Sequence, residues 1–169
     1  AINVNANKIV ANDFDSKVIG IYKRFQELSI EEILQHIYGR IEEYQLSKTN
    51  NEGYLALREC YNKTQSEPLD LFTLICYSFN HQIRFNSKGE FNMPFGKDRS
   101  SFNDSISKNL INFRERIENV VFTNLDFREL KVEKLVEGDF VYCDPPYLIA
   151  CATYKLADRK SGSAGMPRP

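Results

Sequence analysis

The sequence predicts an α/β fold in which a sheet of short strands is interrupted by a mainly helical insertion that carries a β-hairpin. Three observations predict it. Short apolar runs end at or near an acidic residue (Asp13, Asp126 and Asp144), helical spacing of apolar residues follows the first run, and an alternating, glycine-containing stretch occupies 79–97. Ligands of open α/β sheets lie beyond the carboxyl ends of the strands. We therefore expect the three acidic ends to share one rim of the sheet.

Composition limits the classes of protein that this chain can represent. Apolar residues make up 42% of its 169 residues, enough for a core, and the net charge of −1 neither favours nor excludes a nucleic-acid partner. The four cysteines contain no C-x-x-C pair and there are two histidines, so we expect neither a metal site nor a disulfide framework. We find no signal peptide and no apolar run of membrane-spanning length, so we expect a soluble cytoplasmic protein with no membrane partner.

The first strand is expected from Lys8 to Ala11 and is followed by Asn12-Asp13. A helix then begins, with Asp15 or Ser16 as its N-cap. Its apolar face consists of Val18, Ile21, Tyr22, Phe25 and Leu28. Because an acidic residue at such a strand end commonly binds ribose hydroxyls, Asp13 is a candidate ribose ligand. Capping of the turn is an equally good alternative.

The insertion is expected to consist mainly of helices. Ser29 and Glu32 form the pattern of a capping box in front of an apolar stripe. The stripe consists of Ile30, Ile33, Leu34, Ile37, Tyr38 and Ile41. Further helices are expected over 54–61, over 69–79 after Pro68, and over 104–118. We expect these helices to act as scaffold.

A β-hairpin is predicted within 79–97, because two alternating runs flank a polar turn that contains Gly89. From His81 to Arg116, seven Lys or Arg residues stand against four acids. A basic hairpin of this kind can enter a groove of DNA, where Arg suits guanine and Asn or Gln suits adenine. The alternative is a solvated surface hairpin whose phenylalanines form its buried face.

Two more strands are expected near the end of the chain. One covers 120–123 and leads to Asp126-Phe127, and the other covers 139–143 as a buried strand that stops at Asp144-Pro145-Pro146-Tyr147. The prolines donate no backbone hydrogen, so their carbonyls and the carboxylate act as acceptors beside an aromatic face. This arrangement suits a planar base with an exocyclic amine, such as adenine or cytosine. A plain Pro-Pro turn is the alternative.

The motif Asp144-Pro145-Pro146-Tyr147 resembles the catalytic motif of S-adenosylmethionine-dependent amino-methyltransferases, in the form found in adenine-N6 DNA methyltransferases. The stretch from Arg84 to Lys97 resembles the recognition hairpin of DNA adenine methylases that read GATC. The resemblance implies a partial Rossmann-like methyltransferase sheet with an inserted target-recognition domain, in the order of the α class. It also implies methyl transfer to the N6 amine of a flipped adenine in GATC, with double-stranded DNA and S-adenosylmethionine as partners and no metal.

The resemblance further implies roles for individual residues. The implied catalytic residues are Asp144, Pro145, Pro146 and Tyr147. The implied cofactor-binding residues are Asp13, Asp126, Phe127 and Asp144. The implied DNA-binding residues are Arg58, Phe79, Asn80, Gln82, Arg84, Asn92, Pro94 and Lys97. Among these, Phe79 is expected to insert into the duplex and Arg84 to face a guanine.

The resemblance divides the chain into parts. Residues 1–28 and 119–154 are expected in the catalytic domain, 29–118 form the target-recognition domain, and 155–169 form a tail outside the family. The family's glycine-containing cofactor loop is expected before residue 1, so the chain reads as a fragment. The alternative is a catalytically silent DNA-binding module, and the oligomeric state stays open. Methylation of RNA or of a cytosine amine is a third, weaker reading.

Overall fold

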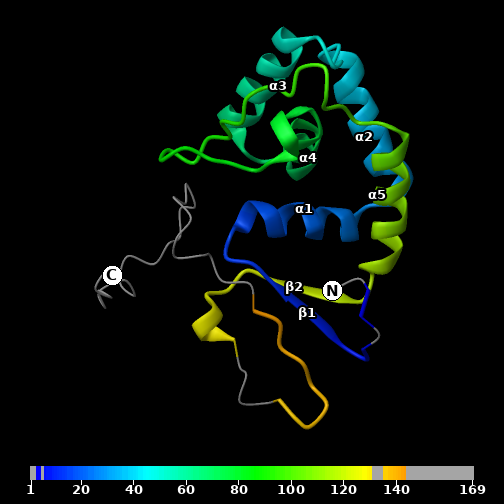
Figure 1. Ribbon diagram of the computed structural model, residues 1–169, viewed down its shortest axis with the longest axis vertical. Coiled ribbons are helices and arrows are strands. Elements are labelled where there is room, and N and C mark those ends of the chain that lie inside the picture. The colour runs from blue at the N-terminus through cyan, green and yellow to red at the C-terminus, as the bar shows by residue number, and fades with distance from the viewer. Residues whose placement is uncertain (1–2, 5, 131–134, 144–169) are drawn as a thin grey trace, which may run out of the picture.

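The structure is a computed structural model that describes residues 3–4, 6–130 and 135–143. In chain order, its elements are β1 (Ile9–Asn12), α1 (Ser16–Glu27), α2 (Ile30–Glu43), α3 (Asn51–Thr64), α4 (Pro68–Tyr77), η1 (Phe79–His81), α5 (Asp104–Arg116), β2 (Val120–Thr123) and η2 (Phe127–Glu129). Helices α2, α3 and α4 form one end of the molecule and the strands the other, with α1 between them (Figure 1). Helix α5 runs along one side from the helical end to β2.

The two strands pair in parallel, with Ile9 opposite Val120 and Asn12 opposite Thr123. This confirms two of the three predicted strands and gives a mixed helix and strand fold. Successive residues of a strand point to opposite faces. One face packs against the helical core, whereas Val10 and Val121 on the other face are 50% and 46% exposed. The carboxyl ends of both strands lie side by side, as parallel pairing requires.

The predicted starts of α1, α2 and α4 are confirmed, whereas α3 begins at Asn51, before the expected Tyr54. Asp15 is the N-cap of α1, and its carboxylate accepts a hydrogen bond from the Lys17 backbone N–H at 2.9 Å. Ser29 and Glu32 form the predicted capping box at the start of α2. Pro68 occupies the first turn of α4, where a missing backbone hydrogen costs nothing. Local side-chain chemistry therefore sets where these helices begin.

One cluster of buried side chains runs from α1 through α4 to α5 and β2. In it, Phe25 of α1 meets Phe72 of α4 edge-on, with ring centroids 5.1 Å apart. The prediction that Tyr38 belongs to the buried stripe of α2 is wrong, because its side chain is 52% exposed. Its ring and the ring of Phe102 lie edge to face with centroids 5.6 Å apart, so part of the side chain packs while the rest stays exposed.

The predicted hairpin is present as a turn without regular strands. Antiparallel bridges occur only singly in the described chain, at Ser78 with Phe95 and at Phe85 with Phe91. The turn is closed by Asn86, whose side-chain Oδ1 accepts the backbone N–H groups of residues 88 and 90. Phe85 and Phe91 face each other between two backbone bonds, from the Asn86 N–H to the Glu90 carbonyl at 2.9 Å and from the Asn92 N–H to the Arg84 carbonyl at 3.0 Å. The backbone groups of Phe91 point away from the other arm and bond to a side chain of α3.

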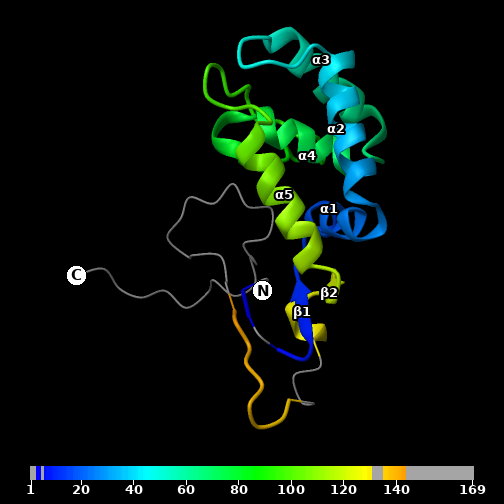
Figure 2. The ribbon, with the colours of Figure 1, turned by 90° about the vertical axis from the view of Figure 1, so that its right-hand side faces the viewer.

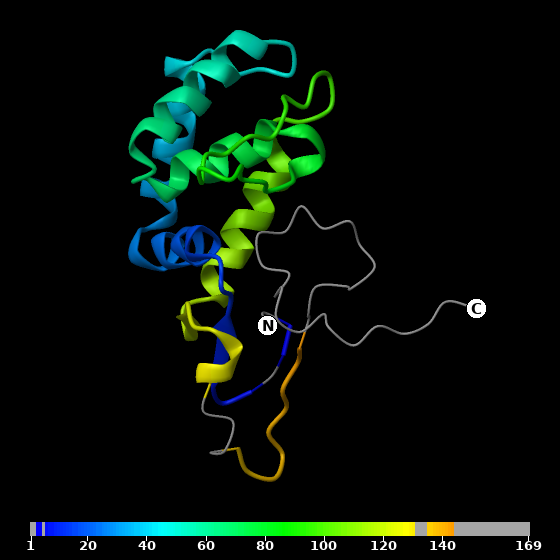
Figure 3. The same ribbon diagram turned by 90° about the vertical axis from the view of Figure 1, so that its left-hand side faces the viewer.

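The prediction of a buried strand over 139–143 is wrong. These residues form no strand, and Phe140 and Tyr142 are 83% and 78% exposed. A buried strand needs hydrogen-bonded neighbours and covered faces, and the described residues give this run no neighbouring strand. It follows a turn at Gly138, in which Asp139 bonds back to Val136 at 3.0 Å. Figures 2 and 3 show 135–143 turning at the end of the molecule opposite α2, α3 and α4 and then running back beside the strands, outside the sheet.

Within these described ranges, none of the helices is both long enough and apolar enough to cross a membrane.

Candidate functional site

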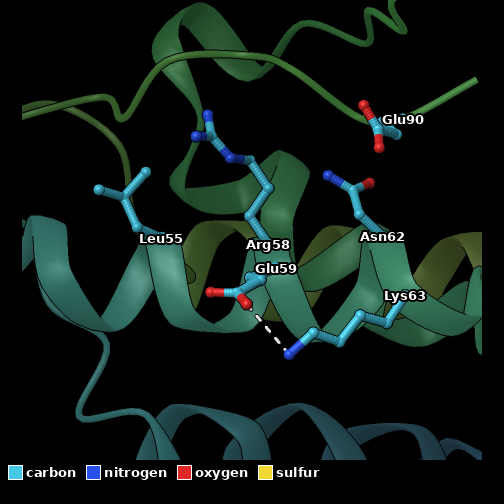
Figure 4. A pocket seen from close by; sticks show the side chains of 6 residues that line it. All are labelled: Leu55, Arg58, Glu59, Asn62, Lys63 and Glu90. Atoms are coloured by element: carbon cyan, nitrogen blue, oxygen red, sulfur yellow. Dashed lines mark ion pairs between the residues drawn. The ribbon is translucent and has the colours of Figure 1, made fainter. Parts of the chain in front are cut away.

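Helix α3 holds the returning arm of the recognition segment, which we define as residues 79–97. Asn62 donates to the carbonyl of Phe91 at 3.0 Å and accepts from the Phe91 N–H at 2.8 Å. One turn and two turns earlier, Arg58 and Tyr54 both donate to the carbonyl of Met93, at 3.0 and 2.9 Å. Figure 4 shows Arg58 and Asn62 extending from α3 toward this arm. Three side chains at helical spacing thus replace a partner strand.

The outer surface of the recognition segment carries most of the predicted DNA-binding residues. The side chain of Phe79 is 41% exposed. The exposed group also contains Asn80, Gln82, Arg84, Pro94 and Lys97. Asn92 is partly buried, and Arg58 lies beneath the segment with its guanidinium on Met93. The structure therefore brings six of these predicted residues to one exposed loop and assigns Arg58 a supporting contact.

Arg84 and Asn92 lie opposite each other across the segment. The Nε of Arg84 donates to the side-chain Oδ1 of Asn92 at 2.9 Å, and Nη2 donates to its backbone carbonyl at 2.9 Å. Among the described residues, Nη1 of Arg84 makes no hydrogen bond. Because a guanidinium is planar, two bonds on one edge fix the direction in which the opposite edge points. Arg84 is therefore an oriented donor on an exposed surface.

A turn with unusual backbone geometry presents Phe79. Its N–H donates to the carbonyl of Pro94 at 2.9 Å, and the next two residues, Asn80 and His81, have φ values of 54° and 51°. Residues other than glycine rarely adopt this left-handed backbone region, and among them Asn tolerates it best. Such backbone conformations cluster at functional sites. The turn directs the chain so that the aromatic ring stays exposed.

Lys17 links α1 to the recognition segment, a residue that sequence reasoning missed. Its Nζ donates to the side-chain oxygen of Gln65 and to the carbonyl of Gly89, and lies 4.2 Å from the ring centroid of Phe85. A cation in the first turn of a helix opposes the helix dipole, so its placement there is a weak sequence signal of a tertiary role. The turn of the segment is thus tied to the helix that follows Asp13.

At the strand ends, Asp13 and Asp126 occupy the common rim that the sequence predicts. The carboxylate of Asp13 accepts the backbone N–H of Asp15 at 2.7 Å. Asp126 caps η2 in a capping box with Glu129, which is the ordinary alternative to ligand binding, and pairs with Arg128 at 2.6 Å. Hydrogen bonds from the Arg128 side chain and backbone lower the pKa of Asp126 to about 2.

Phe127 completes this rim as an open aromatic surface. Its side chain is 73% exposed, and the guanidinium carbon of Arg128 lies 5.8 Å from its ring centroid. The predicted catalytic residues Asp144, Pro145, Pro146 and Tyr147 lie outside the described residues. In the part of the chain that the structure does describe, no three His, Cys, Asp or Glu side chains gather closely enough to hold a metal ion.

The sequence of this chain matches a family of known proteins. A family model described as D12 class N6 adenine-specific DNA methyltransferase matches residues 1–161. The chain belongs to this family. The D12-class match extends past residue 155, where the tail outside the family was expected to begin.

A type II methyltransferase, a modification methylase and a DNA adenine methylase illustrate the similarity. The chain is 49% identical over 160 residues to type II methyltransferase M.FokI of Planomicrobium okeanokoites and 40% identical to modification methylase StsI of Streptococcus sanguinis, with 94% of this chain covered in each. It is 28% identical over 157 residues to DNA adenine methylase of Escherichia coli K12, covering 90% of this chain. The chain spans 25% and 24% of the first two relatives and 53% of the third.

Proposed function

We propose that this D12-class chain forms the DNA-reading part and one side of the cofactor site of an enzyme that methylates the N6 amine of adenine in a specific DNA site. The observation that carries the proposal is the exposed recognition segment, which side chains of α3 and α1 hold in place. A fixed array of donors and an aromatic ring is what direct reading of base edges requires. The family membership supplies the reaction class.

Reading of the duplex is assigned to the exposed loop. Arg84, braced by Asn92, donates to a guanine, and Gln82 and Pro94 face neighbouring base edges. Phe79 enters the base stack beside the extruded adenine, next to Asn80. Lys97 contacts the phosphates, which positions the protein without reading sequence. Arg58 supports the segment through Met93 and approaches the DNA backbone or its flanking base pair.

The recognition sequence is proposed from the same residues. GATC contains one guanine and one adenine per strand, which suits a single oriented arginine, and the segment resembles that of GATC-reading methylases. Because of this resemblance, GATC is the first duplex to test, against duplexes that change its guanine. Other sites are tested beside it, since the chain shares 49% and 40% identity with the type II and modification methylases and 28% with the DNA adenine methylase.

The residues at the strand ends fit the adenosyl half of S-adenosylmethionine. An exposed carboxylate at Asp13 suits ribose hydroxyls, and the open ring of Phe127 suits a stacked adenine. Asp126 orients this turn through its cap and its pair with Arg128. When bound, the cofactor supplies a methyl group activated by its sulfonium. We propose that β1 and β2 belong to a Rossmann-like sheet. Residues 1–28 and 119–154 then form part of the catalytic domain that contains this sheet, and 29–118 form the recognition domain.

The predicted motif supplies the chemistry at the target base. The adenine must leave the stack, because its amine is not reachable inside the duplex. Asp144 and the carbonyl of Pro145 accept hydrogen bonds from the two N–H groups of the amine. Pro146 keeps the turn rigid, and Tyr147 stacks on the base. This directs the nitrogen lone pair toward the methyl group and stabilises the positive charge that develops on nitrogen.

A second function is a DNA-binding module without catalysis. It is favoured by one observation: the recognition segment is anchored at several points, whereas 139–143, which leads to the catalytic motif, lies exposed and outside the sheet. In this reading the chain binds its site but has no measurable affinity for S-adenosylmethionine.

One experiment separates the two functions. The purified 169-residue chain is titrated with S-adenosylmethionine by calorimetry and with a GATC duplex by fluorescence anisotropy. Binding of both ligands supports the methyltransferase, and binding of DNA alone supports the silent module. Failure to prefer any adenine-containing site over a random duplex would overturn both.

A further inference from the structure

Two asparagine side chains join the ends of β1 and β2 where the backbone ladder stops. The last backbone bond between the strands runs from the N–H of Asp13 to the carbonyl of Thr123, at 3.2 Å. Beyond this point the segment after β1 leads into α1 and the segment after β2 leads into η2. The gap between them is spanned by Asn12 from one chain and Asn124 from the other. We call these two residues the asparagine clip.

Asn12 reproduces the hydrogen bonding of a strand. Its Nδ2 donates to the carbonyl of Leu125 at 2.9 Å, and its Oδ1 accepts from the Leu125 N–H at 3.0 Å and from the Thr123 hydroxyl at 2.8 Å. A backbone carbonyl only accepts and a backbone N–H only donates, so the orientation of this amide is determined. Both backbone groups of the residue before Asp126 are therefore held.

Asn124 makes the reciprocal contact. Its Nδ2 donates to the carbonyls of Asp13 and Phe14, at 2.9 and 2.8 Å. Each strand end thus grips the backbone of the other, so the connection does not depend on the ladder alone. The bonds lie at the exposed rim, where water competes and each contributes little to overall stability. Their value lies in fixing relative position.

The clip acts on the residues assigned to the adenosyl group. Its bonds end on Asp13 itself and on Leu125, the neighbour of Asp126 and the second neighbour of Phe127. One rigid adenosine has to meet the carboxylate on one chain and the ring on the other, and small misplacement of binding groups sharply weakens such contacts. We propose that Asn12 and Asn124 are positioning residues for the S-adenosylmethionine site, an inference that rests on the proposed function.

The test uses Asn12→Ala and Asn124→Ala in the 169-residue chain, with Asn109→Ala as a matched control. Asn109 is an exposed asparagine of α5, away from the strand ends. Three properties are measured: S-adenosylmethionine affinity by calorimetry, duplex affinity by anisotropy, and hydrogen exchange of 120–130. Each clip variant is expected to weaken cofactor binding about tenfold and to speed exchange at Leu125, with duplex affinity unchanged. The control is expected to match the parent.

Asn12→Asp provides a second variant of the same size. It keeps the acceptor for the Leu125 N–H but places a carboxylate against the Leu125 carbonyl, so it is also expected to weaken cofactor binding. Parent-like cofactor affinity in both alanine variants, despite faster exchange, would overturn the positioning role alone. If the parent chain itself binds no S-adenosylmethionine, the cofactor assignment fails and the positioning role fails with it.

Discussion

Asn62 on α3 satisfies both backbone polar groups of Phe91, with the carbonyl at 3.0 Å and the N–H at 2.8 Å from its side chain. Phe91 is 1% exposed, so neither backbone group has water as an alternative partner. The recognition segment is therefore held on a helix rather than built into a sheet. Its outer residues can meet DNA while the inner arm stays fixed.

Asn62→Ala is expected to release that arm. It leaves a buried N–H and a buried carbonyl without partners, which costs about 2–3 kcal/mol of unfolding free energy. Urea denaturation measures this loss, and hydrogen exchange locates it at Phe91. Lys63→Met, one position along α3 and removing only an exposed pair with Glu59, is the control and should leave stability unchanged. Equal stability of Asn62→Ala and the parent would contradict the anchoring role.

Lys17→Met is expected to loosen the turn of the segment without unfolding the core. The variant removes the donor to Gln65 and Gly89 while keeping an unbranched chain of similar length. Discrimination between the preferred duplex and a random duplex should fall about threefold to tenfold, since the reading residues lose their fixed geometry. Anisotropy competition measures the ratio.

Lys23→Met is the matched control for this change. Lys23 is an exposed lysine of the same helix, so its loss changes net charge equally. If the two variants discriminate equally well, the effect is one of charge and the tie through Lys17 has no role in reading.

Arg84 and Lys97 are expected to differ in what they contribute to DNA binding. Arg84→Ala should lower the affinity for the preferred site about 10–100-fold and relax the preference for guanine at one position, because a bidentate contact to a base edge is lost. Lys97→Ala should lower the affinity for all duplexes alike and reduce the salt dependence of binding by the equivalent of about one phosphate contact. Binding titrations across salt concentrations distinguish the two. An unchanged base preference in Arg84→Ala would exclude it as a reader.

A buried carboxylate joins α2 and α4. Asp70 is 4% exposed and accepts hydrogen bonds from His36 at 2.7 Å and from Arg40 at 2.8 Å. Burial alone would raise the pKa of Asp70, but the bonds from His36 and Arg40 outweigh it and hold the pKa below its usual value. Asp70→Asn is expected to lower the unfolding free energy by about 2–4 kcal/mol at pH 7.

The hydrogen bonds to Asp70 also predict that the unfolding free energy depends on pH. Because the folded state lowers the pKa of Asp70, its contribution is present above the unfolded pKa of about 3.9 and is lost as the pH falls through the lower folded value. The stability difference between parent and Asp70→Asn should therefore narrow below about pH 4. Urea midpoints measured from pH 7 to pH 3 give the comparison. A difference that stays constant over this range would contradict the assignment.

The sequence predicts the parts of this molecule that local chemistry determines. The caps at Asp15 and Ser29 and the apolar runs of β1 and β2 carry their own signals. Contacts between distant segments do not. Asn62 reaches Phe91 across 29 residues and leaves no pattern in its own stretch. Lys17 reaches Gly89 across 72 residues and leaves only the weak signal of a cation in the first turn of a helix. The run 139–143 looks like a strand because of its composition, but a strand also needs neighbours.

The most direct test of the central claim is methyl transfer itself. The 169-residue chain and its Asp144→Ala variant are incubated with labelled S-adenosylmethionine and a GATC duplex, and the digested DNA is analysed for N6-methyladenine by mass spectrometry. We predict N6-methyladenine with the parent chain and a loss of about 100-fold or more with the variant. Equal rates in the two proteins would contradict the role of Asp144. A parent chain that binds the duplex, yields no methylated adenine and has no measurable affinity for S-adenosylmethionine would support the silent module.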